Sequence, residues 1–166
     1  MQLIQRNDVL PASFCHQLVG EYSGLLEPAA VGNGKKKTYR GGRNAMSHEM
    51  KSSMQLNAYT TGLAKAAVGG DIGFPVRPMH CDLVMYGIGD GFSRHRDAIK
   101  KEFTCIYFLN EGYGGGDLCF DDGTVFSKMP AGSAVCWKNT EDSSHWVSEV
   151  TSGQRYILAH WLEAIK

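Results

Sequence analysis

Two side chains that can bind a metal ion, His95 and Asp97, stand two residues apart in the segment FSRHRDA, residues 92–98. Alternate residues of an extended segment point the same way, so both side chains can reach one ion. Two imidazoles and one carboxylate on one face of Fe(II) form a facial triad, which leaves the other coordination positions open for a co-substrate and oxygen. A His-x-Asp pair also occurs by chance on ordinary surfaces, so the pair alone does not identify a site.

A third ligand would have to come from another part of the chain. His145 is the best candidate, because it begins the strand-like segment HWVSEV after the polar stretch KNTEDSS. The other histidines are interpreted as surface, capping or strand residues without a partner pattern: His16, His48, His80 and His160.

Arg155 follows ten residues later, in the segment GQRYILAHWL. An arginine buried inside a β fold is costly unless a carboxylate meets it, and its planar fork suits a small dicarboxylate. The alternation of a strand places Arg155 on the same face as Trp161 and opposite to His160. An exposed arginine on an edge strand is the alternative.

The elements that must position these residues lie mainly after Pro78. Short apolar segments rich in β-branched and aromatic residues alternate there with Gly, Asn and Asp, which predicts strands. About half a dozen to eight such strands indicate an α+β, mainly β, fold with a sandwich or a jelly-roll barrel. The segments are MHCDLVMYGIG, FTCIYFLNEG, GGDLCFDD, GSAVCWKN, SHWVSEVTSG and RYILAHWLEA.

The N-terminal part has a different texture. We expect a short strand at Leu3 and Ile4, then a helix that begins at Pro11 and is ended by Pro28 and the glycines after it. VGNGKKKTYRGGRNA, residues 31–45, reads as a mobile basic loop or a loose hairpin. The segment that starts SHEMKSSMQL is a second helical region.

Length and composition fit one domain over residues 1–166, with 1–79 as helical support and basic loop and 80–166 as the jelly-roll core. Lys plus Arg equals Asp plus Glu at 17 each, so no global field attracts nucleic acid or a membrane. No apolar run approaches 18 residues and no charged-then-apolar leader is seen, so we expect a soluble, cytoplasmic protein.

The odd number of cysteines and the lack of a C-x-x-C pair predict five reduced thiols: Cys15, Cys81, Cys105, Cys119 and Cys136.

Three segments taken together carry a resemblance to a known family: YGIGDGFSRHRDA, FTCIYFLNEGYGGGDLCF and HWVSEVTSGQRYILAHWL. They resemble the Fe(II)/2-oxoglutarate-dependent oxygenases, and within them the prolyl 4-hydroxylase-like branch, closely over residues 80–162 and more loosely over 1–79. The resemblance implies a double-stranded β-helix (jelly roll) core with N-terminal helices packed on it. It also implies Fe(II) bound by His95, Asp97 and His145.

The resemblance further assigns the co-substrates. Arg155 would pair with the distal carboxylate of 2-oxoglutarate, and Tyr86 would face the co-substrate or the mouth of the site. Related hydroxylases carry a tyrosine where this chain has Phe108, so either another group, Thr104, compensates for the missing hydroxyl or the affinity for 2-oxoglutarate is lower. O2 completes the reaction, with ascorbate as a candidate reductant. Halogenating relatives lack the carboxylate ligand, so Asp97 favours hydroxylation.

The resemblance implies hydroxylation of proline in a peptide or protein; a free amino acid or another small molecule is an alternative. A binding or sensor module with a silent site is an alternative of another class. Nucleic acid is disfavoured, because relatives that act on it carry a second arginine after the first. The basic stretch is either a solvated connection or a lid for an anionic substrate. The candidate substrate residues are Arg96, Lys35, Lys36, Lys37 and Arg40.

Overall fold

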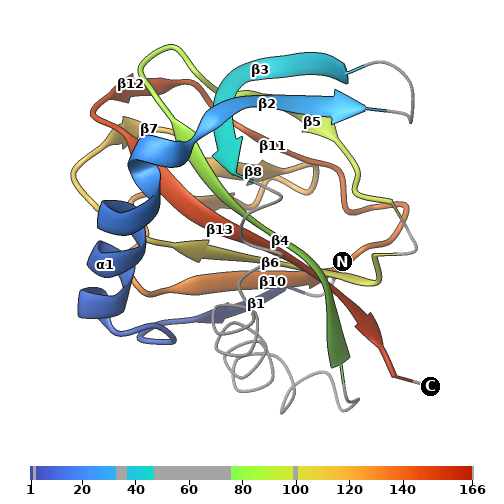
Figure 1. Ribbon diagram of the computed structural model, residues 1–166. Helices are drawn as coiled ribbons and strands as arrows, with labels where there is room; N and C mark the ends of the chain where they lie inside the picture. Colours follow the sequence, from blue (N-terminus) through green and yellow to red (C-terminus); the bar gives the residue numbers. More distant parts are fainter. Residues whose placement is uncertain (2, 33–36, 47–75, 99–100, 166) are drawn as a thin grey trace.

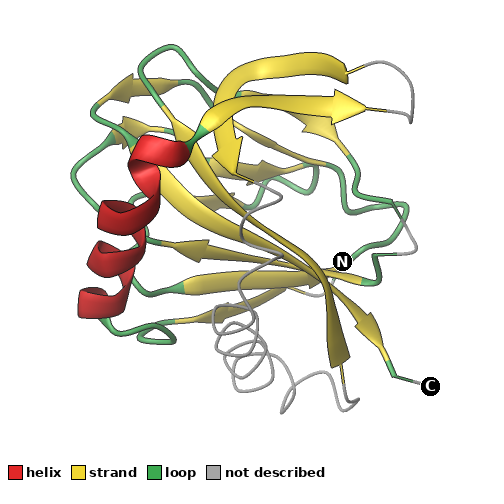
Figure 2. Ribbon diagram, viewed as in Figure 1, coloured by secondary structure: helices red, strands yellow, loops and turns green. Residues whose placement is uncertain are grey.

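The computed structural model describes residues 1, 3–32, 37–46, 76–98 and 101–165. In this part of the chain two packed β-sheets are accompanied by the helix α1 (Ala12–Tyr22) and a single 3-10 turn, η1 (Ser23–Leu25) (Figures 1 and 2). None of the described helices is both long and apolar enough to span a membrane.

The larger sheet has seven strands, and every neighbouring pair is antiparallel. The order across the sheet is β1 (Leu3–Arg6), β10 (Ala134–Lys138), β6 (Phe103–Phe108), β13 (Arg155–Ala164), β4 (Val76–Tyr86), β3 (Lys37–Met46) and β2 (Glu27–Gly32). From β1 to β4, strands adjacent in this sheet are far apart in the sequence, as in a jelly roll.

The smaller sheet has four strands and carries one side of the pocket described below. Its order is β5 (Phe92–His95), β11 (His145–Val147), β8 (Leu118–Phe120) and β9 (Val125–Phe126), and a separate short ladder joins β7 (Gly114–Gly115) to β12 (Val150–Ser152). The predicted mainly β fold is confirmed, and each strand-like segment after Pro78 contains at least one strand.

The strands of the larger sheet alternate between two hydrophobic clusters. One cluster, here called the helix-side core, packs Leu83, Tyr107 and Leu158 against Cys15 and Leu18 of α1. The other, here called the inter-sheet core, lies between the two sheets and contains Val84, Phe108, Leu118, Trp137 and Ile157. Neighbouring residues of β13 therefore belong to different cores, as the period of two requires.

The N-terminal part contributes more than the helical support expected of it. The helix ends at Tyr22, earlier than predicted, and Pro28 lies in β2 because an edge strand tolerates a residue without an N–H. The basic stretch forms a hairpin of β2 and β3 that extends the larger sheet beyond β4, which agrees with the loose-hairpin alternative. The predicted second helical region, from residue 47 to 70, lies outside the described residues.

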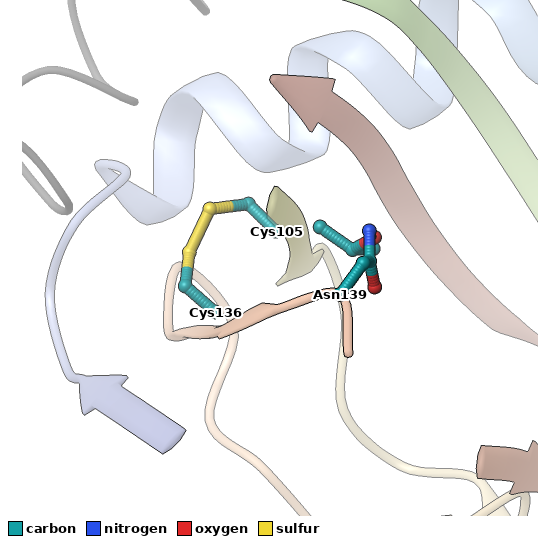
Figure 3. The surroundings of a disulfide bond; sticks show 4 residues. Cys105, Cys136 and Asn139 are labelled. Carbon is teal, nitrogen blue, oxygen red and sulfur yellow. A yellow bond between two sulfur atoms is a disulfide. The ribbon is translucent and has the colours of Figure 1, made fainter. Parts of the chain in front are cut away.

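The cysteines correct one prediction. Cys105 on β6 and Cys136 on β10 lie opposite each other and form a disulfide, with their Cα atoms 4.2 Å apart (Figure 3). Cys15, Cys81 and Cys119 are free and buried. The expectation of five reduced thiols is therefore wrong for this pair, and it no longer supports a reducing compartment. The register between β6 and β10 brings the two cysteines together, and the spacing of cysteines in the sequence does not reveal that register.

Candidate active site

The two strands at the edge of the smaller sheet bring the predicted metal ligands together. His95 at the end of β5 pairs in register with His145 at the start of β11, and their ring centroids are 4.3 Å apart. Asp97 follows β5, and its Oδ1 lies 4.0 Å from His95 Nε2. One possible ligand atom from each residue lies within 4.8 Å of the other two, so the triad can surround a single ion.

Backbone carbonyls set the proton positions on both histidines. His95 Nδ1 lies 2.9 Å from the carbonyl oxygen of Ser93, and His145 Nδ1 lies 2.9 Å from that of Ser143. A carbonyl oxygen only accepts, so each Nδ1 carries the hydrogen and each Nε2 is the nitrogen that can bind a metal. The two imidazoles therefore fit the ligand form that Fe(II) needs.

The Asp97 carboxylate is also prepared for a cation. Burial raises the pKa of Asp97, but attraction to His145 and hydrogen bonds from Trp161 and Thr104 outweigh it, so its pKa lies below the ordinary value. Thr104 Oγ1 donates to Asp97 Oδ2 over 2.7 Å, and Trp161 Nε1 donates to the same oxygen over 2.9 Å. The carboxylate is therefore anionic at neutral pH, with a fixed orientation.

A pocket of about 500 Å³, including its solvent-open mouth, lies between the two sheets next to the triad. Its walls combine a few polar groups with aliphatic and aromatic side chains: Asp82, Val84, Tyr86, Phe92, His95, Asp97, Thr104, Ile106, Leu118, Trp137, His145, Val147, Arg155, Ile157, Ala159 and Trp161. Four of these residues alternate along β13, which confirms that Arg155 and Trp161 share a face.

Arg155 is the most unusual residue of the pocket. It is fully buried, its three guanidinium nitrogens form no well-aligned hydrogen bond in the described part of the chain, and the Tyr113 phenol is a polar neighbour. The guanidinium lies 5.2 Å from the ring centroid of Tyr86 and 5.4 Å from that of Phe108. A buried positive charge without a partner is costly, so the site is suited to an anion that enters the pocket. The alternative of an exposed edge-strand arginine is wrong.

The comparison with known families decides what this pocket belongs to. A family profile described as the 2OG-Fe(II) oxygenase superfamily matches residues 81–163, which contain the triad, Arg155 and all the strands around the pocket.

The chain belongs to this superfamily.

Individual relatives agree with the family. A PKHD-type hydroxylase of Verminephrobacter eiseniae is 37% identical over 90 residues, which are 52% of this chain and 37% of that protein. A prolyl-4-hydroxylase of Pseudomonas putida has the same fold, with a TM-score of 0.71 at 24% identity over 96% of this chain and 91% of that one. A prolyl hydroxylase of Trichoplax adhaerens, solved with a hypoxia inducible factor peptide fragment, gives 0.73 at 17% identity over 98% and 83%. The chain spans well under two thirds of the first relative's length.

Membership of the 2OG-Fe(II) oxygenase superfamily implies Fe(II), 2-oxoglutarate and O2, and the residues of this chain fit the first two. Two imidazole nitrogens and one carboxylate can hold the iron, and the unpartnered guanidinium of Arg155 can hold a carboxylate of 2-oxoglutarate. Ascorbate stays a prediction.

Two further predicted residues line the pocket, but their positions differ from the expectation. Tyr86 is buried beside Arg155 and directly opposite it in the strand register, as expected of a residue that faces the co-substrate. Thr104 instead hydrogen-bonds to Asp97, so its hydroxyl serves the metal ligand. Which group replaces the hydroxyl missing at Phe108 stays a prediction.

Tyr113 is a residue that the sequence reasoning missed. Burial raises its pKa, and the charge of Arg155 opposes that rise, which places the phenol close to the guanidinium. The chain is tightly packed here, since a Cβ on Gly116 would lie 2.8 Å from Arg155 Cδ and this glycine has a φ of +66°. Tyr113 is therefore a candidate for the second donor at the Arg155 end.

Trp161 and Asn139 were also not predicted as site residues. Alternation had already placed Trp161 on the pocket face, and that signal could have identified it. Asn139 follows β10 and reaches the site only through Thr104, to which its Nδ2 donates over 2.8 Å. No sequence pattern connects residues 139 and 104.

Most of the predicted substrate side chains lie outside the described residues. Arg96 is exposed, and its Nη1 donates to the carbonyl oxygen of Glu141 at the rim. Lys37 and Arg40 belong to β3, but their side chains are outside the description, and Lys35 and Lys36 are wholly outside it. Of the rejected histidines, His16 is exposed on α1 and His160 is buried on the face opposite Trp161.

Proposed function

We propose that this chain is an Fe(II)- and 2-oxoglutarate-dependent oxygenase that hydroxylates a C–H bond, with proline in a peptide or protein as the substrate. The observation that carries the proposal is one pocket with two different charged groups in its wall. The ligand triad can hold a cation, and Arg155 can hold an anion. Trp161, which contacts Asp97, lies six residues from Arg155 along β13, so the two groups mark different ends of the pocket.

Each group then has a defined task. Bound Fe(II) and 2-oxoglutarate supply the activation of O2, with succinate and CO2 as co-products. His95 and His145 present Nε2 to the metal, and Asp97 balances its charge. Arg155 orients the co-substrate through a charged, bidentate contact. The aliphatic walls between them, including Leu118 and Ile157, keep water away from the reacting groups.

Support for a peptide or protein substrate comes from the named relatives and from the hairpin of β2 and β3. This hairpin continues the larger sheet and contacts β5, the strand that carries His95. In the sequence, Lys35 and Lys36 stand between the two strands, and Lys37 and Arg40 belong to β3. We propose that these charges, together with Arg96 at the rim, favour an anionic substrate.

The central test measures succinate formed from 2-oxoglutarate in the presence of Fe(II), with a panel of proline peptides and free amino acids, and searches the products by mass for one added oxygen. We expect turnover in the wild-type protein and none in His145→Ala. His16→Ala is the matched control, because His16 is exposed on α1 and remote from the pocket. Oxygen added only to free amino acids would replace the peptide assignment with the small-molecule alternative.

The proposal fails if the wild-type protein forms no succinate with any member of the panel and shows no visible absorption when Fe(II) and 2-oxoglutarate are added anaerobically. That result would favour the binding or sensor module. Equal turnover in His145→Ala and wild type would instead show that the third ligand is wrongly assigned.

The role of the basic hairpin is tested separately by neutralising Lys35, Lys36 and Lys37 together. Substrate-free turnover of 2-oxoglutarate should stay nearly unchanged, while the apparent affinity for an anionic peptide should fall. The loss should shrink at high salt, because exposed charges are screened over about 8–10 Å at physiological ionic strength. An unchanged affinity would return the stretch to a solvated connection.

A further inference from the structure

One carboxylate oxygen of Asp97 is held by two donors from different strands. Thr104 on β6 donates its hydroxyl to Oδ2 over 2.7 Å, and Trp161 on β13 donates its indole N–H to the same oxygen over 2.9 Å. The other oxygen, Oδ1, is the one that faces His95 Nε2. The two oxygens of one ligand therefore have different environments.

Asn139 fixes the direction of the Thr104 hydrogen. The Asn139 Nδ2 group donates one hydrogen to the carbonyl oxygen of Lys101 and the other to Thr104 Oγ1, the latter over 2.8 Å. A carbonyl only accepts, so the amide nitrogen must face it and must also be the atom beside Thr104. Thr104 accepts from Asn139 and has only Asp97 to receive its single hydrogen.

Lys101 contacts both arms of this arrangement. Its carbonyl accepts from Asn139, and its Nζ lies 3.9 Å from the centroid of the Trp161 ring, where a cation is attracted to the π face. The Lys101 ammonium therefore contacts one face of the Trp161 indole, while the indole N–H donates to Asp97. Thr104 and Asn139 are also nearly fully buried, at 1% and 4% exposure, so water does not compete for these hydrogen bonds.

We infer that Thr104 and Trp161 are positioning residues that hold Asp97 Oδ2, so that Asp97 binds the metal through Oδ1 alone. With both donors on Oδ2, the carboxylate cannot rotate to place both oxygens on the ion. The coordination position that a second oxygen would occupy stays open for co-substrate and oxygen, as the facial triad requires. Asn139 acts one step further away, by orienting the Thr104 hydroxyl.

This inference rests on the metal centre of the proposed function, but it does not require turnover. Co(II) is a suitable probe, because its visible absorption changes with coordination number and needs neither oxygen nor substrate. The test compares the Co(II) dissociation constant and spectrum of the wild type with Thr104→Val and Trp161→Phe, which remove one donor each and keep most of the side-chain volume.

We expect Co(II) affinity to fall roughly 10- to 100-fold in each variant, the usual effect of removing a hydrogen-bond partner of a metal ligand. The absorption should also change, because Oδ2 becomes free to bind the ion. Thr104→Ser keeps the hydroxyl and should behave as wild type. Trp146→Phe is the matched tryptophan control, since Trp146 stands next to His145 on β11 but does not line the pocket.

Wild-type affinity and spectrum in both Thr104→Val and Trp161→Phe would overturn the inference. Should Thr104→Val fail to fold, as thermal unfolding would show, Trp161→Phe and Thr104→Ser decide the matter between them. The outcome is separable from the proposed activity. A wild type that binds Co(II) but forms no succinate defeats the activity alone, whereas unchanged variants in an active enzyme defeat only the positioning role.

Discussion

The two faces of the larger sheet are built from the same strands and do different work. On the helix side, Leu83, Tyr107 and Leu158 fill a core closed by α1. On the pocket side, the intervening residues include Thr104, Arg155 and Trp161, which line the pocket. Adjacent residues of one strand, such as Tyr156 and Arg155, thus belong to different environments.

The two faces of the larger sheet differ in what they contribute to stability: the helix side stabilises the fold, whereas the pocket side carries groups for binding at a cost in stability. The helix side gains from close packing of hydrophobic side chains. The pocket side buries a guanidinium that has no carboxylate partner among the described residues, which costs stability unless an anion binds. Substitutions on the helix side should therefore lower stability and spare binding, and those on the pocket side should do the reverse.

The largest expected effect is on the helix side. Leu158→Ala removes a fully buried side chain and should lower the free energy of unfolding by about 2–5 kcal/mol. The Co(II) dissociation constant, measured at a temperature where the variant is folded, should stay within about twofold of wild type, because Leu158 points away from the pocket. Urea unfolding and metal titration check the two parts. A large loss of metal affinity in the folded variant would break the division between the faces.

The disulfide between Cys105 and Cys136 also lies in the helix-side core and should contribute to stability. A bridge that closes a loop of 31 residues between Cys105 and Cys136 should contribute about 2–4 kcal/mol, which a reductant should remove. Alkylation of the denatured, non-reduced protein followed by mass measurement should label three thiols, those of Cys15, Cys81 and Cys119. The double variant Cys105→Ala/Cys136→Ala is the control and should be insensitive to reductant. Five labelled thiols would restore the expectation from the sequence.

Arg155→Met tests the pocket side and should have opposite effects on binding and stability. Loss of a charged hydrogen-bonded contact should weaken 2-oxoglutarate binding by roughly 1.5–3 kcal/mol. The ligand-free protein should become more stable by about 1 kcal/mol, or roughly 2–4 °C in Tm, since an unpaired buried charge is removed. Thermal shift with and without 2-oxoglutarate measures both.

Arg77→Met is the control for this prediction, because Arg77 forms an exposed ion pair with Glu163. A ligand-free Arg155→Met protein that unfolds well below the wild type would mean that the guanidinium stabilises the fold by itself.

The smallest expected effect concerns the Arg155 end. Tyr113→Phe should raise the 2-oxoglutarate concentration needed for half saturation by a few-fold, about 0.5–1.5 kcal/mol for one hydrogen bond. Because burial raises the pKa of Tyr113 above its ordinary value near 10, its hydroxyl should remain a neutral donor between pH 7 and 9. The difference between the variant and wild type should accordingly stay constant over that range. Phe108→Tyr, which restores a hydroxyl beside Arg155, is the companion measurement. Unchanged saturation in Tyr113→Phe would remove Tyr113 from the site.

The sequence by itself determined the strands after Pro78, the proximity of His95 to Asp97 and the face of Arg155, while the role of His145 came from the family resemblance. These features depend on local spacing, because the period of two in a strand is set by the backbone of that strand alone. The end of the first helix was misplaced, since Pro28 fits the beginning of an edge strand as well as it fits the end of a helix.

Only the tertiary structure decided the partners across strands. The same register between β6 and β10 pairs Cys105 with Cys136 and sets Trp137 opposite Thr104. It brings Asn139 to Thr104, and the neighbouring β13 brings Trp161 to Asp97. Residues 31 to 64 positions apart meet in these contacts. Their meeting depends on how distant strands align, which is a property of the assembled sheet that no local pattern in the chain expresses.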